Sequence, residues 1–142
     1  MRHLLSIFYG IFILILTCTE SIKKFSMEGR PSFLWNPDPD FKSFLDFHHY
    51  PFDSPAYITQ KSGHILAFFL FALISHAAIK RASAVFILST VFGICPEIAQ
   101  LFFSRTGCLL DAGYNVLGIT LYFIFHSVGQ KLLKSPSKVQ SG

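Results

Sequence analysis

Apolar residues are concentrated in four blocks, and the segments between them carry most of the charged residues. A helix that crosses a bilayer needs about 20 apolar residues, with roughly 17 to 25 acceptable. The last two blocks meet this length directly, and the second does so when Gln60 and Lys61 are counted as its interfacial start. The blocks are Leu4–Cys18, Gly63–Ile79, Ala82–Phe103 and Leu109–Val128.

The first block is short enough to resemble a signal peptide, because Arg2 and His3 precede it. Small residues suited to cleavage do not follow it, and Ile15-Leu16-Thr17-Cys18 is a poor lipobox. We therefore interpret this block as a retained helix. The sequence predicts an all-α integral membrane bundle of four transmembrane helices.

Basic residues give this bundle an orientation. Arg2, the Lys80-Arg81 turn and the lysines after the last block fall on one side, and no acidic residue lies in those segments. Short cytoplasmic loops are enriched in Lys and Arg. We therefore expect both termini to be cytoplasmic. The resulting parts are a first transmembrane helix (1–19), an external loop rich in Pro and aromatic residues (20–60), a three-helix region (61–128) and a cytoplasmic tail (129–142).

The composition indicates a protein that lies in a lipid bilayer, and it does not indicate a soluble domain or a nucleic-acid-binding protein. Of the 142 residues, 51% are hydrophobic and only 14% charged, against about 25% charged in a typical soluble domain. The net charge of +4 comes from residues between apolar blocks, without a basic stripe or a nucleic-acid-binding motif. Membrane lipids are the expected partners, and nucleic acid is not. The sequence specifies no oligomeric state.

The external loop contains aromatic residues that suit a membrane interface. Phe41, Phe44, Leu45 and His48 recur at helical spacing, so we expect one or two helical turns there. His48, His49 and Asp53 show no recognised metal-ligand spacing. Phosphate-loop and HExxH motifs are absent from the sequence. No metal and no cofactor is predicted.

Polar residues inside the apolar blocks are the candidates for function, because ionisable groups are costly in a membrane. They occur three or four residues apart, so each set shares one helix face. With the predicted orientation all the sets lie at the outer end of the bundle, and we predict that they form one site. The site residues are Lys61, His64, Glu97, Gln100, Arg105, Asp111 and Asn115.

Pro96 and the glycines are expected to shape the helices around this site. Pro96 cannot donate to the carbonyl oxygen of Phe92, which exposes backbone polar groups near Glu97. Gly10, Gly93, Gly113 and Gly118 are expected to permit close approach between helices. Pro96 and Gly118 are therefore assigned structural roles.

These residues, in this order, resemble the signature of VanZ-like membrane proteins. The outline is K-x-x-H, E-x-x-Q, R and D-x-x-x-N-x-x-G, with hydrophobic helices between the elements. It corresponds to Lys61–His64, Glu97–Gln100, Arg105 and Asp111–Gly118, within a region from Tyr57 to Phe125. The resemblance implies a multi-pass protein of the bacterial cytoplasmic membrane connected with the cell envelope, in a family whose founding member is associated with teicoplanin resistance. It implies no particular reaction.

Three hypotheses for the site remain open at the level of sequence. In the first, the protein is an enzyme acting on a lipid-linked envelope substrate, with His64 or Glu97 as the proton carrier. Lys61 and Arg105 would then bind a phosphate or carboxylate, with Gln100, Asp111 and Asn115 also contacting or orienting the substrate. In the second, the same residues only recognise a lipid headgroup or a glycopeptide-type ligand. In the third, the polar cluster is structural and holds the helices in register. Transport is disfavoured for a single bundle of four helices and would require a path formed by an oligomer.

Overall fold

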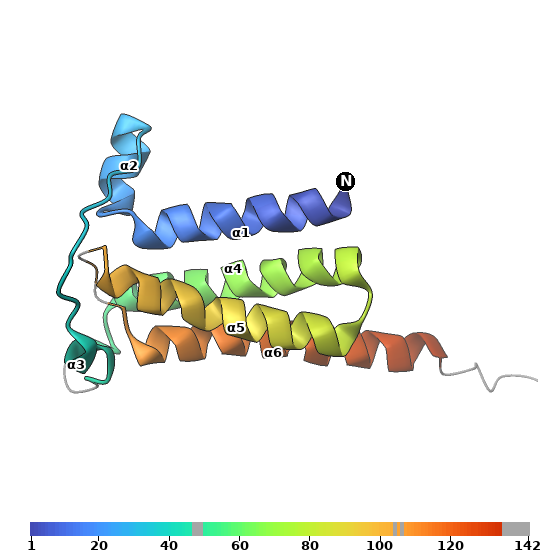
Figure 1. Cartoon of the computed structure of the whole chain (residues 1–142). Coiled ribbons are helices and arrows are strands. Elements are labelled where there is room, and N and C mark those ends of the chain that lie inside the picture. Colours follow the sequence, from blue (N-terminus) through green and yellow to red (C-terminus); the bar gives the residue numbers. More distant parts are fainter. Residues whose placement is uncertain (47–49, 104, 106, 135–142) are drawn as a thin grey trace, which may run out of the picture.

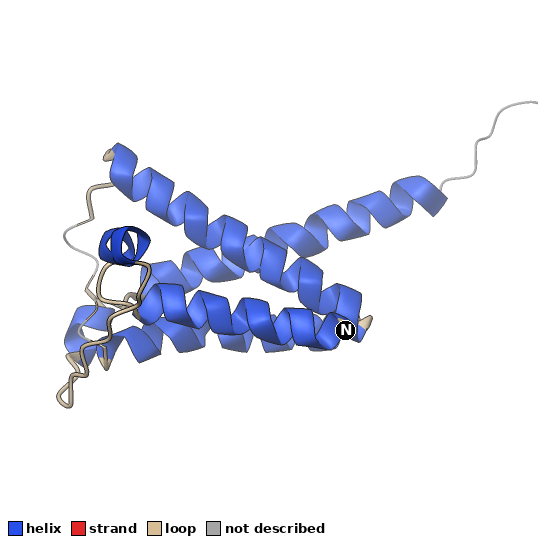
Figure 2. Cartoon of the chain, turned by 90° about the horizontal axis from the view of Figure 1, so that it is seen from above, coloured by secondary structure: helices blue, strands red, loops and turns tan. Residues whose placement is uncertain are grey.

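The computed structural model describes residues 1–46, 50–103, 105 and 107–134. These residues form helices, and no strand occurs among them (Figure 2). The two short helices lie at the same end of the bundle but apart from each other, and the N-terminus lies at the other end (Figure 1). The helices are α1 Arg2–Cys18, α2 Ile22–Glu28, α3 Phe41–Phe44, α4 Pro55–Ile79, α5 Ala82–Leu101 and α6 Leu109–Lys134.

In the described part of the chain, three helices are long and apolar enough to cross a membrane, namely α4, α5 and α6. The prediction of an all-helical protein is confirmed for the described residues. The fourth predicted span, α1, is apolar but has only 17 residues, which is about 25 Å at a rise of 1.5 Å per residue. A typical hydrocarbon core is about 30 Å thick, so α1 is short for a crossing.

Local sequence explains where several helices begin and end. Helix α4 starts six residues before Lys61, because Ser54 is its N-cap and Pro55 occupies the first turn, where the missing N–H of proline costs nothing. The same helix ends at Lys80, which has a left-handed φ of 59° and donates its N–H to the carbonyl oxygen of His76. Arg81 is the N-cap of α5, which begins at Ala82, so the turn between α4 and α5 is as tight as expected.

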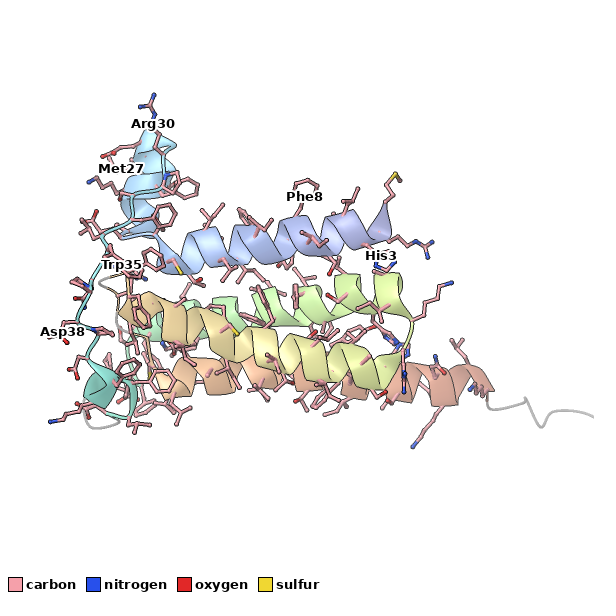
Figure 3. The ribbon with its side chains drawn as sticks, in the orientation of Figure 1. His3, Phe8, Met27, Arg30, Trp35 and Asp38 are labelled. Atoms are coloured by element: carbon pink, nitrogen blue, oxygen red, sulfur yellow. The ribbon has the colours of Figure 1, made fainter. Side chains whose placement is uncertain are left out.

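The bundle buries polar side chains and exposes apolar ones. Large hydrophobic residues such as Phe8, Leu88 and Phe125 are exposed along the helices, and Phe8 points away from the other helices (Figure 3). Meanwhile Lys61, Glu97 and other polar residues are buried. A soluble domain of this size does not leave so much apolar surface exposed, so the arrangement fits a protein surrounded by lipid.

Helices α4 and α6 form the most extensive contact, with α5 packed against both and α1 against α4 and α5. The central apolar contact joins three of them, and its buried members are Ile13, Phe68, Ala72, Ile119 and Tyr122. Gly118 allows α6 to approach α4, since a Cβ atom there would lie 2.2 Å from the carbonyl oxygen of Ile65.

Other glycines differ in their surroundings. A Cβ atom at Gly10 would lie 3.3 Å from the ring of Phe71, and one at Gly93 would lie 3.4 Å from Asn115 and from Ile119. Gly113 has open space around it. The expectation that Gly113 permits close helix approach is therefore wrong, because its face of α6 meets no neighbouring helix.

The segment between α1 and α4 forms an aromatic layer over the end of α5. Trp35 stacks on Phe102, with ring centroids 5.8 Å apart, and Phe33 and Phe41 contact Phe103 and Phe102 respectively. The predicted turn at Phe41 and Phe44 is present as α3, whereas His48 lies outside the described residues. Helix α2, with Ser21 as its N-cap and Gly29 as its left-handed C-cap, is not anticipated by the apolar pattern.

Candidate functional site

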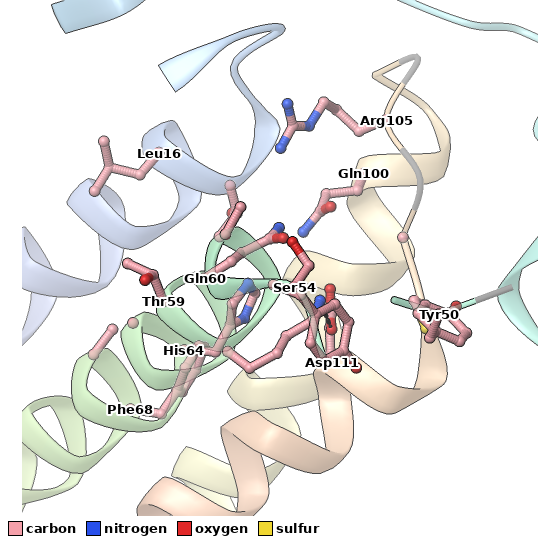
Figure 4. Close-up of a pocket in the computed structure, with 18 of the residues that line it drawn as sticks. Leu16, Tyr50, Ser54, Thr59, Gln60, His64, Phe68, Gln100, Arg105 and Asp111 are labelled. Carbon is pink, nitrogen blue, oxygen red and sulfur yellow. Dashed lines mark hydrogen bonds and ion pairs between the residues drawn. The ribbon is translucent and has the colours of Figure 1, made fainter. Parts of the chain in front are cut away.

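A cavity of about 800 Å³ opens between α1, α4, α5 and α6, at the end of the bundle where α1 ends and α4 begins (Figure 4). Its volume is in the range of small-molecule sites, about 300 to 1,000 Å³. Five of the predicted site residues line one part of it, namely Lys61, His64, Gln100, Arg105 and Asp111. Apolar side chains line another part, and these are Ile13, Leu16, Ala67 and Phe68.

A buried ion pair joins α4 to α6 in this cavity. The Nζ atom of Lys61 lies 2.5 Å from Oδ1 of Asp111, and both side chains are more than nine-tenths buried. The same Nζ lies 4.7 Å from the centre of the Tyr57 ring, which adds a cation–π contact. The two charges balance each other, so neither is available in full to a ligand.

A second network surrounds Glu97 on α5. Its Oε1 accepts a hydrogen bond from Nδ2 of Asn115 at 3.1 Å, and its Oε2 accepts one from Nε2 of Gln100 at 3.2 Å. Nδ1 of His64 lies 2.9 Å from Oδ1 of Asn115 and 3.7 Å from Oε1 of Glu97. Glu97 is fully buried. Three helices therefore contribute to one hydrogen-bonded cluster.

The backbone around Pro96 takes part in this cluster. Asn115 Nδ2 also donates to the carbonyl oxygen of Gly93 at 2.8 Å, so an α5 carbonyl bonds across the bundle. Helix α5 continues through Pro96 to Leu101. A Cβ atom at Gly93 would lie 3.4 Å from Cβ of Asn115, which is ordinary van der Waals contact. Gly93 is the residue after Phe92, whose carbonyl oxygen is the one predicted to lose its donor at Pro96.

Arg105 enters the site from the segment between α5 and α6. Its Nη1 donates to the carbonyl oxygen of Glu20 at 2.8 Å, which ties the end of α1 to this segment. Among the described residues no carboxylate forms an ion pair with Arg105. Asp46 and Asp111 line the same cavity as Arg105.

The site residues divide into two groups by their access to the cavity. Lys61, His64, Gln100, Arg105 and Asp111 line it, whereas Glu97 and Asn115 lie behind them and do not. Gly118 lies one turn beyond Asn115 on α6 and acts through the contact with Ile65. The structure thus brings all the predicted polar residues together, but it gives Glu97 and Asn115 no direct contact with the cavity.

Tyr50 and Cys108, which close one side of the cavity, carry no marker in the sequence. The hydroxyl of Tyr50 lies 2.7 Å from Sγ of Cys108. Burial and this contact raise the pKa of Tyr50 above its ordinary value. Both residues line the cavity. An isolated Tyr in a loop and an isolated Cys before a helix follow no recognised motif, so only the fold reveals their pairing.

The described residues contain no group of three or more His, Cys, Asp or Glu side chains arranged to hold a metal ion. His48 and His49 lie outside the described residues. Cys18, Cys95 and Cys108 are free cysteines.

A known protein is similar to the chain over most of its length. An uncharacterized membrane protein of Bacillus subtilis strain 168, YwnJ, is 32% identical over 126 residues, which cover 87% of this chain and 88% of YwnJ. The chain belongs to the YwnJ family. No protein-family profile matches the chain, and no solved structure matches it.

Membership of the YwnJ family makes the chain a membrane protein, in agreement with its apolar helices. This setting changes the energetics of the site. Charged groups removed from water are strongly stabilised by partners and strongly destabilised without them. The Lys61–Asp111 pair and the donors around Glu97 provide those partners. The polar cluster is therefore a set of mutually dependent residues.

Proposed function

We propose that this YwnJ-family protein is a VanZ-like protein of the bacterial cytoplasmic membrane that recognises an amphiphilic envelope lipid. In this proposal α1 is the fourth span, both termini are cytoplasmic and the cavity opens at the outer leaflet. The lipid presents a phosphate or a carboxylate to Arg105, and its apolar part lies against Phe68 and α1.

The single observation that carries this proposal is the two-part lining of the cavity. Arg105 and His64 line one part, and Ile13, Leu16 and Phe68 line the other. Arginine is suited to phosphate and carboxylate because its planar guanidinium offers several donors to oxygen atoms. Lys61 is already paired with Asp111, so Arg105 is the better candidate for the residue that binds the anion. An amphiphile satisfies both parts of the lining at once.

Native mass spectrometry of the full-length protein, released from neutral detergent, tests this function. The added probes are dioleoylphosphatidylglycerol, palmitate and uncharged dioleoylglycerol. We expect one or both anionic probes to bind, and dioleoylglycerol to bind at least tenfold more weakly. The two anionic probes distinguish a phosphate from a carboxylate.

Arg105→Gln is the informative variant, and Arg30→Gln is its matched control. Arg30 is exposed and points away from the bundle near the end of α2 (Figure 3). A hydrogen bond to a charged group contributes about 1.5 to 3 kcal/mol, so Arg105→Gln is expected to weaken the anionic probe about 10- to 100-fold. Equal binding by the two variants, or equal binding of charged and uncharged probes, contradicts the proposal.

A structural role for the cluster is the second candidate. It is favoured by the observation that Lys61–Asp111 and His64–Asn115 both join α4 to α6. In that case substitutions in the cluster lower the stability of the protein without any bound lipid, and Arg105→Gln leaves lipid binding unchanged.

A further inference from the structure

The orientation of the Asn115 amide follows from its neighbours. One amide atom lies 2.8 Å from the carbonyl oxygen of Gly93 and 3.1 Å from Oε1 of Glu97. A backbone carbonyl only accepts hydrogen bonds, so that amide atom is the NH₂ group. The oxygen of Asn115 therefore faces His64. This assignment does not depend on any choice of protonation for the histidine.

The orientation of Asn115 fixes the tautomer of His64. Because Oδ1 of Asn115 is an acceptor, Nδ1 of His64 at 2.9 Å must carry the hydrogen. In the neutral ring the lone pair then resides on Nε2. Within the described part of the chain Nε2 makes no hydrogen bond, and His64 lines the cavity while Asn115 does not. The basic nitrogen is therefore Nε2, which makes no hydrogen bond with Asn115.

Glu97 is placed to stabilise the protonated form of this ring. When Nε2 gains a proton, the imidazolium charge lies close to Oε1 of Glu97, which is 3.7 Å from Nδ1. Lys61 is bound to Asp111, so Glu97 is not needed to balance Lys61. A carboxylate behind an imidazole performs the same two tasks in Ser-His-Asp triads, orienting the ring and stabilising its charge. Here the side chain of Asn115 lies between the carboxylate and the ring.

We infer that His64 is the general base of the cavity and that the bound amphiphile is a phosphate ester. This rests on the proposed function, because it requires an amphiphile in the cavity. Of the two anions that suit Arg105, only a phosphate ester offers an electrophilic atom beside the base. Asn115 and Glu97 are positioning residues for His64.

The reaction is a transfer of the phosphoryl group to the oxygen of a hydroxyl group, which belongs to water or to a second lipid. Nε2 of His64 accepts the proton as the O–H bond breaks, and the oxygen bonds to phosphorus. The bond from phosphorus to the original alcohol oxygen breaks with its electron pair, and that oxygen takes the proton from Nε2. Arg105 stabilises the charge on the remaining phosphate oxygens.

Nitrogen NMR of histidine tests the assignment directly. In ¹⁵N-histidine-labelled protein without lipid, the His64 signals are identified by their loss in His64→Gln. We expect Nδ1 to carry the hydrogen in the neutral ring. Hydrogen on Nε2 would overturn the inference and leave the lipid-binding proposal untouched, because that is measured separately.

Asn115→Leu tests the positioning role, with Thr120→Val on the same helix as its control. We expect Asn115→Leu to give a mixture of the two tautomers and Thr120→Val to keep the wild-type form. An unchanged tautomer in folded Asn115→Leu counts against the role of Asn115. If that variant does not fold, the wild-type spectrum still decides which nitrogen carries the hydrogen.

The chemical step is tested on vesicles made from the total lipids of Bacillus subtilis, with mass spectrometry of the lipids before and after incubation. Wild-type protein should convert a phosphate-ester lipid, and His64→Gln should lower the rate at least 100-fold while still binding the anionic probe. Absence of any conversion, or equal conversion by His64→Gln, would overturn the catalytic assignment even when lipid binding is confirmed.

Discussion

Replacing Gly118 by Ala tests the contact on which the whole site depends. A Cβ atom at this position would lie 2.2 Å from the carbonyl oxygen of Ile65, 2.9 Å from its carbonyl carbon and 3.1 Å from its Cα. All three are backbone atoms of α4, so no side chain can rotate away. Ordinary van der Waals contact begins at 3.4 Å. Helices α4 and α6 must therefore separate locally by about 1 Å.

The expected loss of stability follows from this displacement. Overpacking in a well-packed interior costs typically 1 to 3 kcal/mol, and a collision with backbone belongs at the upper end, at about 3 kcal/mol. Gly113→Ala is the matched control on the same helix, because open space surrounds that position. Replacing a glycine inside a helix by alanine gains roughly 0.5 to 1 kcal/mol. Both variants receive this gain, so they should differ by the overpacking cost alone, about 3 kcal/mol.

Equilibrium unfolding in mixed micelles, with the SDS fraction increased and helix content followed by circular dichroism, measures this difference. Gly118→Ala should unfold at a lower SDS fraction than the wild type, and Gly113→Ala at the same or a higher one. The displacement also lengthens the contact between His64 and Asn115, which joins the same two helices. Equal unfolding midpoints for the two variants would refute the packing of α4 against α6 described above.

Three further predictions concern the ion pair, the orientation and the loop. Lys61→Met should lower the free energy of unfolding by about 3 to 5 kcal/mol, because it leaves a buried carboxylate unpaired. Adding Asp111→Leu should restore most of that stability, and an additive loss in the double variant would contradict this. In cysteine-free protein in intact cells, Met27→Cys should react with a membrane-impermeant maleimide and Ser83→Cys should not. The reverse pattern would show that the protein has the opposite orientation in the membrane. Burial and its contact with a thiol raise the pKa of Tyr50, so folding stability should fall as the pH rises through the unfolded value of about 10. Tyr50→Phe should reduce that fall, and unfolding midpoints between pH 8 and 11 measure it.

The sequence allowed the site to be predicted because polar residues in an apolar block are unusual and their helical spacing is regular. Lys61 with His64 and Glu97 with Gln100 each share a helix face, and their distance from the helix ends gives their depth. The structure places these residues together through Asp111 and Asn115. The number of long apolar helices was less predictable, because α1 is near the lower limit of length for a span.

The walls of the cavity were not predictable for a physical reason. In a soluble helix the polar face marks the side toward water, but in lipid both faces of a helix are apolar. Ile13 and Leu16 on α1 line the cavity, whereas Phe8 and Phe12 on the same helix are exposed, and nothing in residue type separates the pairs. The rotation of α1 about its axis is set by Gly10 against Phe71 and Phe92, a contact visible only in the fold.

The distribution of charge supports the proposed anionic ligand, although two acidic residues, Asp46 and Asp111, line the cavity. Lys61 and Asp111 neutralise each other at 2.5 Å, and Glu97 is held by Asn115 and Gln100 behind the cavity wall. Arg105 is bonded to a neutral carbonyl oxygen, so its positive charge is balanced best by a group that enters the cavity. In the proposed complex a bound phosphate supplies that balance next to His64, whose Nδ1 lies 3.7 Å from Oε1 of Glu97. The same arrangement disfavours a cationic ligand, which would meet Arg105 with a like charge.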